Sequence, residues 1–155
     1  MRLDYRVALP EASRAMMELE RVVEGSTLEP ALLELVKLRA SELNGCAWCA
    51  DMHTKDARAM GETEQRLYLV SMWREAPCYS DRERAALAWT EALTLLPQTG
   101  APDDAYADVE RCFDPAERVA LTLAIIAING WNRLNVGFRR PVGDYVAKHH
   151  AAVPG

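Results

Sequence analysis

The stretch LEPALLELVKLRASELNGCAWCADMH, residues 28–53, decides the fold expected for this chain. Leucine and valine side chains recur at helical spacing after Pro30, a residue that suits the first turn of a helix. Asn44 and Gly45 then end that helix, because glycine readily adopts the left-handed conformation found just past many helix ends. A second helix carries the two cysteines. The sequence therefore predicts a helical pair over about residues 29–61.

The rest of the chain has helical periodicity as well, and the sequence has no alternating pattern bounded by hairpin turns. The fold class that we expect is therefore all-α, in a single domain that spans residues 1–155. Residues 97–104, PQTGAPDD, are expected to form a loop. Three further helices are predicted before the loop: from Pro10 to just before Gly25, over residues 62–75, and from the Ser80–Glu83 capping box to Leu96. A short helix is predicted after residue 104. Two more are predicted from Asp114 to Gly130 and from Trp131 toward His149.

The sequence also contains a candidate internal repeat of two helices. When the sequence is aligned with itself, the opening stretch at residues 28–53 matches a second segment, residues 113–138, FDPAERVALTLAIIAINGWNRLNVGF. Both copies have an acidic-Pro start, a helix of equal length, an Asn-Gly break and another helix. The second copy, about residues 114–149, carries apolar or aromatic residues where the first copy carries polar ones. This degenerate repeat therefore points to the first copy as the holder of the site.

Charge and composition exclude several classes of function. The net charge of −5 and the scattered basic residues argue against nucleic acids and anionic membrane surfaces as partners. The longest apolar stretch, Val119–Ile128, is about half of what a bilayer span needs, and the N-terminus lacks the apolar core of a signal peptide. Four cysteines without an export signal indicate a reducing cytoplasm. We therefore expect a cytoplasmic protein that uses paired thiols for chemistry or metal binding.

Two cysteines and a histidine fall on one face of the second helix. Cys46, Cys49 and His53 are spaced by three and four residues, which puts their side chains on one stripe. The Asn-Gly break puts both cysteines near the first turn, where free backbone N–H groups and the helix dipole favour an anion. The thiolate is the reactive form of cysteine, and the CxxC spacing also allows the two sulfurs to close a small disulfide ring. The pattern favours redox chemistry.

Two other interpretations of these residues stay open. Free cysteine is among the most buried residue types, so the pair could be ordinary core residues, and the isolated Cys78 and Cys112 are expected to be that. A zinc site would need four ligands, with Glu34 joining the other three in a mixed and uncommon set. A thioredoxin-type site is not expected, because the chain lacks the βαβ pattern that accompanies it.

A specific spacing joins four residues of the opening stretch. The pattern is a Glu, eleven residues, CxxC, three residues and a His, and its members are Glu34, Cys46, Cys49 and His53. In an all-helical chain of this size, the pattern resembles the AhpD-like alkylhydroperoxidases of the carboxymuconolactone decarboxylase superfamily. The segments SDRERAALAWTEAL, residues 80–93, and INGWNRLNVGFRRPVG, residues 128–143, are similar to later helices of that family. The decarboxylases of the superfamily lack the CxxC, so the resemblance favours the peroxidase branch.

The resemblance implies a mechanism. Cys49 would attack the terminal oxygen of a hydroperoxide and become a sulfenic acid. Cys46 would protonate the departing oxygen and then condense with the sulfenic acid, which gives a Cys46–Cys49 disulfide. His53 would accept a proton, and Glu34 would orient it. An external dithiol of the dihydrolipoamide type would reset the disulfide, and the implied site uses no metal and no cofactor.

Two further expectations concern Trp48 and assembly. Trp48 stands where the best-studied pattern of the family has a histidine, and we expect it to shape an apolar mouth for the substrate or to pack at a subunit contact. The family forms trimers or hexamers, so the resemblance implies a homotrimer or a homohexamer. The competing hypotheses are a zinc-stabilised or redox-sensing module without catalysis, and a superfamily enzyme that acts on another substrate.

Overall fold

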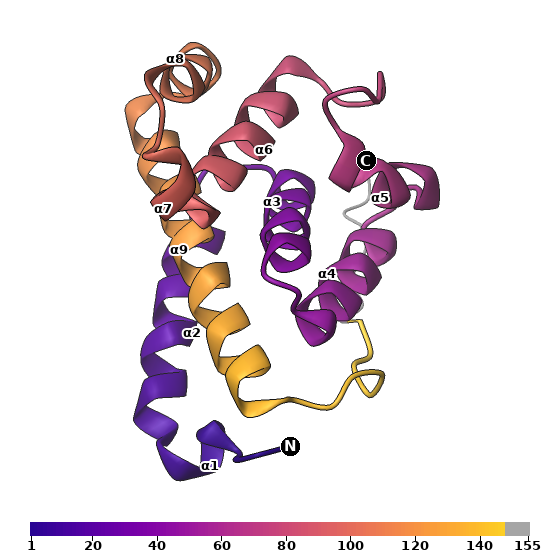
Figure 1. Cartoon of the computed structure of the whole chain (residues 1–155), viewed down its shortest axis with the longest axis vertical. Helices are drawn as coiled ribbons and strands as arrows, with labels where there is room; N and C mark the ends of the chain where they lie inside the picture. The colour runs from indigo at the N-terminus through magenta and orange to yellow at the C-terminus, as the bar shows by residue number, and fades with distance from the viewer. Residues whose placement is uncertain (148–155) are drawn as a thin grey trace.

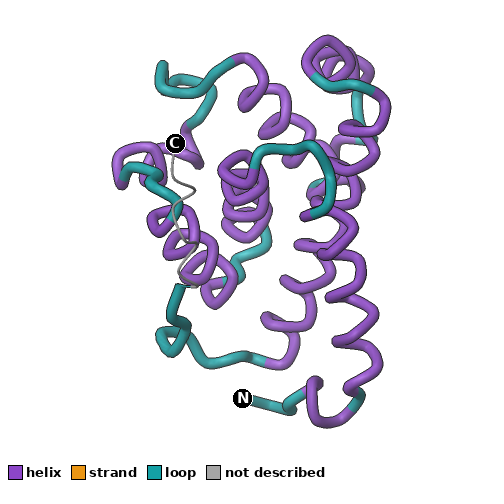
Figure 2. Tube along the Cα trace, turned by 180° about the vertical axis from the view of Figure 1, so that it is seen from behind, coloured by secondary structure: helices purple, strands orange, loops and turns teal. Residues whose placement is uncertain are grey.

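The computed structural model describes residues 1–147, and helices make up most of that part of the chain (Figures 1 and 2). Residues 1–147 contain no β-strand, which confirms the all-α fold class. The elements are α1 (Tyr5–Ala8), α2 (Pro10–Glu24), α3 (Pro30–Leu43), α4 (Ala47–Ala59), α5 (Glu64–Leu69), the short 3-10 helix η1 (Val70–Met72), α6 (Asp81–Thr94), α7 (Leu96–Thr99), α8 (Asp103–Cys112) and α9 (Pro115–Phe138).

The predicted pair over residues 29–61 is confirmed as α3 and α4, and α2 begins at Pro10 as expected. The capping box is also confirmed, because Ser80 accepts from the Glu83 backbone while the Glu83 side chain accepts from the Ser80 backbone. Two predictions were wrong in part. The helix expected over residues 62–75 is divided into α5 and η1, and α7 lies at the start of the expected loop. The helix α1 was not predicted, because four residues are too few to show a helical period.

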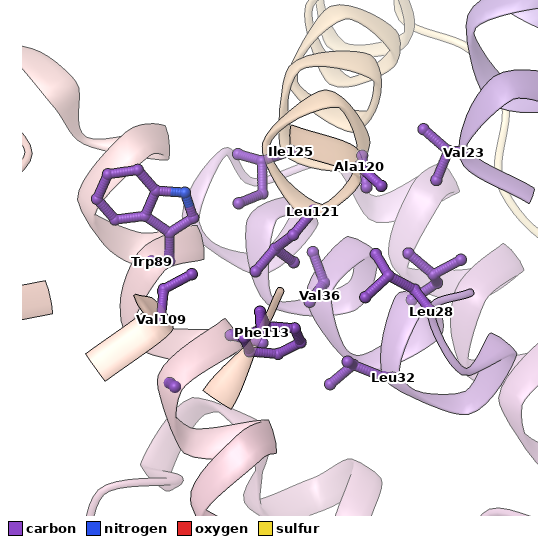
Figure 3. Packing of buried hydrophobic residues seen from close by; sticks show 14 of the residues in the cluster. Val23, Leu28, Leu32, Val36, Trp89, Val109, Phe113, Ala120, Leu121 and Ile125 are labelled. Carbon is purple, nitrogen blue, oxygen red and sulfur yellow. The ribbon is translucent and has the colours of Figure 1, made fainter. Parts of the chain in front are cut away.

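The helix α3 lies in the middle of the molecule, between α4 on one side and α9 on the other (Figure 1). Its apolar residues are distributed around most of its circumference, so it is buried against α4, α6 and α9 together. Figure 3 shows Val36 of α3 close to Leu121 of α9, with Trp89 of α6 beside them in the same core cluster. This central position lets α3 present residues to both α4 and α9.

The helix α9 corrects the prediction of a break at Asn129 and Gly130. It runs without interruption to Phe138, and what was predicted as a new helix from Trp131 is its continuation. Residues 139–147 then return toward α4 as an irregular segment, and the end of the predicted helix, at His149, lies outside the described residues. The second copy of the candidate repeat is thus one long helix up to Phe138, and a common origin of the two segments stays a prediction.

The two Asn-Gly pairs have different physical roles, which explains the error. Gly45 has a φ of 66°, the left-handed conformation that ends α3. Gly130 is helical instead, and a Cβ atom at its position would lie 2.8 Å from the Met16 Cε atom of α2. Glycine at this position therefore lets α2 pack closely on α9 and does not end the helix.

Among the described residues, α9 is also the one helix long and apolar enough to cross a membrane, with a mean hydropathy of 1.2. It packs on α2, α3 and α6 within the molecule. One such helix is weak evidence for a membrane span, because a helix that packs in the core of a folded domain passes the same test of length and composition.

Candidate active site

The two cysteines lie at the start of α4. Cys46 is the residue that caps the helix, with extended backbone angles, and its Sγ accepts a hydrogen bond of 3.3 Å from the backbone N–H of Cys49. The sulfurs of Cys46 and Cys49 lie at disulfide distance, with 5.4 Å between the Cα atoms. Both residues are buried. The first turn of a helix presents free N–H groups, so this position suits a sulfur that carries negative charge.

His53 lies one turn beyond Cys49 and pairs with Glu34 of the neighbouring α3. The His53 Nδ1 and Glu34 Oε2 atoms are 2.7 Å apart, and both side chains are buried. Because an ionised carboxylate only accepts, the proton of this contact belongs on Nδ1, and in the neutral form of the ring Nε2 then carries the lone pair. The His53 Nε2 atom is buried and has no hydrogen-bond partner. The structure thus brings all four predicted site residues together.

A pocket of about 410 Å³ opens beside this group. Cys49, His53 and Glu34 line it, whereas Cys46 does not. Most of the other lining side chains are apolar, and they are Met17, Leu28, Pro30, Leu33, Trp48, Met52, Met60, Ile128 and Trp131. A molecule in this pocket therefore meets the Cys49 side of the pair in mainly apolar surroundings.

Trp48 forms part of the pocket wall and is held by the segment that follows α9. The Arg140 guanidinium carbon lies 3.4 Å from the centre of a Trp48 ring, and the Tyr145 ring meets the indole edge-on at 5.9 Å. The Tyr145 hydroxyl donates to the Asp56 carboxylate of α4, and Lys55 donates to the Tyr145 carbonyl at 2.9 Å. Sequence reasoning did not predict these contacts, because it placed residues 140–145 in a helix toward His149, whereas the structure has an irregular segment there.

A buried ion pair forms another part of the wall. Lys37 Nζ lies 2.7 Å from Glu20 Oε2, and Trp131 Nε1 donates to the other oxygen of Glu20 at 3.1 Å. Lys37 is one turn after Glu34 on α3, so one helix supplies charged groups to two places on the pocket. No sequence signal distinguished this pair from an ordinary solvated helix surface.

Asn135 is a third contact that the sequence analysis missed. Its Nδ2 atom lies 3.3 Å from the Cys49 Sγ, and its Oδ1 atom accepts a hydrogen bond of 2.9 Å from the Tyr5 hydroxyl. Both residues are buried. Asn135 reaches the site from α9 and Tyr5 reaches it from α1, and both are far from the CxxC motif along the chain. A single asparagine on a long helix forms no motif that the sequence analysis could recognise.

Residues 1–147 contain no group of three His, Cys, Asp or Glu side chains placed to hold a metal ion. Cys78 and Cys112 lie apart from the site as free thiols of intermediate exposure. Each packs against a hydrophobic core cluster, so they are at the edge of the core and not within it.

The fold and the cysteine pair define an AhpD-like all-α domain, and the sequence comparison agrees. The model of the Carboxymuconolactone decarboxylase family matches residues 10–92. The chain belongs to this carboxymuconolactone decarboxylase family. It is 44% identical over 135 residues to the uncharacterized protein YdfG of Bacillus subtilis (strain 168), and the match covers 87% of this chain and 92% of that protein.

Solved structures give the same fold. A structure from Agrobacterium tumefaciens, ATU0492, superposes with a TM-score of 0.89 at 49% identity and covers 93% of this chain and 99% of that one. It is described as a protein of unknown function, assigned provisionally to antioxidant defence as AhpD. The debrominase Bmp8 superposes with a TM-score of 0.78 at 17% identity over 87% of this chain and 73% of that one, a likeness of fold alone.

Proposed function

We propose that the protein is a thiol-dependent hydroperoxide reductase that cycles through a Cys46–Cys49 disulfide. The observation that carries this proposal is the asymmetry of the pair. Cys49 lines the pocket beside His53, while Cys46 lies behind it at bonding distance. One sulfur is thus placed to meet a substrate, and the other is placed to resolve the product.

In the first step, the Cys49 thiolate attacks the terminal oxygen of the hydroperoxide. The O–O bond breaks, the sulfur becomes a sulfenic acid, and the departing alkoxide takes a proton to become an alcohol. Cys46 is the nearest thiol that can give this proton. Its thiolate then attacks the sulfenic sulfur and forms the disulfide, and the departing hydroxide leaves as water by taking back the proton that His53 had accepted from the Cys49 thiol.

His53 and Glu34 provide the acid–base chemistry of this cycle. The lone pair on His53 Nε2 accepts a proton from a thiol or from the hydroperoxide, directly or through water, while Glu34 stabilises the charge that forms on the ring. Two of the three buried side-chain atoms without partners in residues 1–147 belong to pocket-lining residues, His53 Nε2 and Trp48 Nε1. An acceptor and a donor without partners are complementary to a hydroperoxide, which has both an O–H group and oxygen acceptors.

The pocket favours an organic hydroperoxide over hydrogen peroxide. Its volume of about 410 Å³ and its apolar lining suit a molecule that buries hydrocarbon, whereas hydrogen peroxide gains nothing from such surroundings. An external dithiol of the dihydrolipoamide type would reduce the disulfide by exchange, which balances the two electrons given to the substrate. A cytoplasmic location would keep that reductant available.

Peroxide consumption by pre-reduced protein tests the proposal. Wild type, Cys49→Ser and Cys46→Ser are mixed with cumene hydroperoxide or hydrogen peroxide, and their thiols are mapped by mass spectrometry. We expect wild type to consume roughly one equivalent of the organic peroxide and to end with the Cys46–Cys49 disulfide, while Cys49→Ser stays inert. Cys46→Ser should stop at a sulfenic acid on Cys49.

Two outcomes would contradict the proposal. Wild-type thiols that stay reduced in both peroxides would favour a superfamily enzyme with another substrate. Stoichiometric zinc that protects both thiols from alkylation would favour the zinc-stabilised module instead, and metal analysis of the purified protein separates the two.

A further inference from the structure

We propose that Asn135 is a further catalytic residue: its amide N–H group holds the Cys49 sulfur as a thiolate, and Tyr5 keeps the amide in the orientation that allows this. The proposal rests on the proposed function only in taking Cys49 as the reacting thiol. Both residues lie outside residues 10–92, the part of the chain that the family model matches.

The contact between Asn135 and Cys49 is direct. The amide Nδ2 atom lies 3.3 Å from the sulfur, within hydrogen-bond distance for a sulfur acceptor. Asn135 is 3% exposed and Cys49 is 1% exposed, so water competes little for either group. A hydrogen bond from a neutral donor to a charged acceptor is stronger than one between neutral groups, and the thiolate therefore gains more from this amide than the thiol does.

Tyr5 determines which end of the amide faces the sulfur. Its hydroxyl lies 2.9 Å from Oδ1 of Asn135, and both groups are buried. If the amide turned over, its oxygen would face the thiolate, and two electron-rich atoms would be in contact. A hydroxyl that donates to Oδ1 disfavours that arrangement and leaves the N–H groups directed at Cys49.

The N-terminal segment holds Tyr5 in this position. The backbone N–H of Arg2 donates to the Phe138 carbonyl at the end of α9, at 2.8 Å. The Tyr5 ring packs against Phe138 at 5.9 Å and Trp131 at 6.5 Å between ring centres. The segment before α2 is therefore fixed on the same helix that carries Asn135, and it acts on the site through that residue. Tyr5 is a positioning residue.

The surroundings of Cys49 explain why such a donor matters. The sulfur belongs to a cluster with Ala40, Trp48 and Ile128, and apolar burial disfavours a thiolate. The start of α4 offsets part of this cost through its dipole, but the Cys49 backbone N–H is already used by Cys46 Sγ. The Asn135 amide supplies a hydrogen bond where the helix start does not.

The test measures the reactivity of Cys49 toward iodoacetamide as a function of pH, by mass spectrometry of its peptide. Cys46→Ser serves as the parent protein, because it cannot form the disulfide. Relative to this parent, we expect Asn135→Leu to raise the midpoint of the pH profile by about one unit and to slow alkylation at pH 7 by roughly tenfold. Tyr5→Phe should give a smaller shift in the same direction.

Asn132→Leu is the matched control. Asn132 lies on the same helix and is as deeply buried, but its amide donates to Ser41 and does not reach the sulfur. We expect Asn132→Leu to lose as much thermal stability as Asn135→Leu does. The midpoint of the pH profile of Cys49 alkylation should stay unchanged. Asn135→Asp keeps the size of the side chain and the contact with Tyr5, but it replaces the amide N–H donor with a carboxylate oxygen. It therefore tests the role of the donor if Asn135→Leu fails to fold.

The inference is overturned if the profiles of the Asn135 variants coincide with that of the parent protein, or if Asn132→Leu shifts as much. Iodoacetamide is not a peroxide, so this result does not depend on peroxidase activity. A shifted midpoint in a protein that consumes no peroxide would leave the role of Asn135 standing and refute the proposed function alone.

Discussion

His53 Nε2 is a buried nitrogen atom without a partner, and such an atom is costly to keep. An unsatisfied buried polar group destabilises a fold by about 1–3 kcal/mol, so most proteins pair or expose it. Here the other ring nitrogen is fixed by Glu34 at 2.7 Å, and the ring cannot turn without breaking that bond. The arrangement is understandable if a substrate or a nearby thiol supplies the missing partner during the reaction.

Replacing Glu34 tests this pairing. We expect Glu34→Gln to slow the oxidation of Cys49 by cumene hydroperoxide by ~10²-fold, because the amide cannot stabilise a protonated ring as a carboxylate does. Quenched-flow mass spectrometry of the Cys49 peptide gives the rate. The control is Glu42→Gln on the same helix, whose carboxylate pairs with Arg39 at 3.1 Å and does not line the pocket. Equal rates in the two variants would refute a role for Glu34.

At the scale of elements, the Asn-Gly dipeptide has different structural roles in α3 and in α9. Gly45 ends α3 because its left-handed backbone is difficult for other residues, whereas Gly130 stays in α9 to make room for Met16. The α3–α4 pair was predictable because the apolar spacing, Pro30 and Gly45 all indicate the same helix with the same start and end. The break in α9 was predicted wrongly because the close packing of α2 on α9 leaves no local trace in the sequence.

Alanine substitutions separate the two roles. Gly45→Ala should lower the free energy of unfolding by ~1–2 kcal/mol, since an L-residue pays that much in the left-handed region. Gly130→Ala should change it by less than about 1 kcal/mol, because the gain in helix propensity offsets a shift of the flexible end of Met16. Urea unfolding followed by circular dichroism measures both. A Gly45→Ala variant that unfolds at the same denaturant concentration as wild type would contradict the left-handed role assigned to Gly45.

Glu91 of α6 joins three parts of the fold. Its Oε1 atom accepts from Arg39 of α3 and from the Trp73 indole, both at 2.8 Å, and Arg74 pairs with its other oxygen. Burial alone would raise the pKa of the Glu91 carboxyl, but the hydrogen bonds from Trp73, Arg74 and Arg39 together lower it below its ordinary value of 4.5. A lowered pKa in the folded state contributes stability above the ordinary pKa, and that contribution is lost as the pH falls through the folded value.

We therefore expect Glu91→Gln to lower the free energy of unfolding by ~2 kcal/mol at pH 7 and by clearly less at pH 3. Denaturant unfolding at the two pH values measures the difference. Glu18→Gln is the control, because its exposed pair with Arg21 should be worth at most ~0.5 kcal/mol. A Glu91→Gln effect that stays constant with pH would contradict the role of its charge.

At the scale of the whole molecule, the candidate site combines near and distant parts of the chain. Cys49 and His53 were predictable because they lie one turn apart on one helix, whereas Glu34, on the preceding helix, was predicted through the resemblance of the spacing to the family. The contacts from Tyr5 and Asn135 could not be predicted, because they join residues 130 and 86 positions apart. Such contacts depend on how α1 and α9 pack around α3, which local patterns do not encode.

The outer face of α9 suggests an assembly. Val119 and Ile126 are 60% and 53% exposed and lie two turns apart on the same side of the helix. We expect a homotrimer or homohexamer by size-exclusion chromatography with light scattering, and a smaller species for Ile126→Glu, because a charge at a buried contact opposes association. A wild-type monomer at micromolar concentration would contradict this expectation. Unchanged assembly of the variant would place the contact elsewhere.

Trp48 packs in one buried cluster with Cys46 and Cys49, beneath the Arg140 guanidinium. A disulfide quenches the emission of an indole that touches it, whereas a reduced pair does so much less. The protein therefore carries its own optical reporter of the state of the dithiol. A Trp48→Phe variant identifies the part of the emission that belongs to this residue, and that part follows each round of oxidation and reduction in real time without any added label.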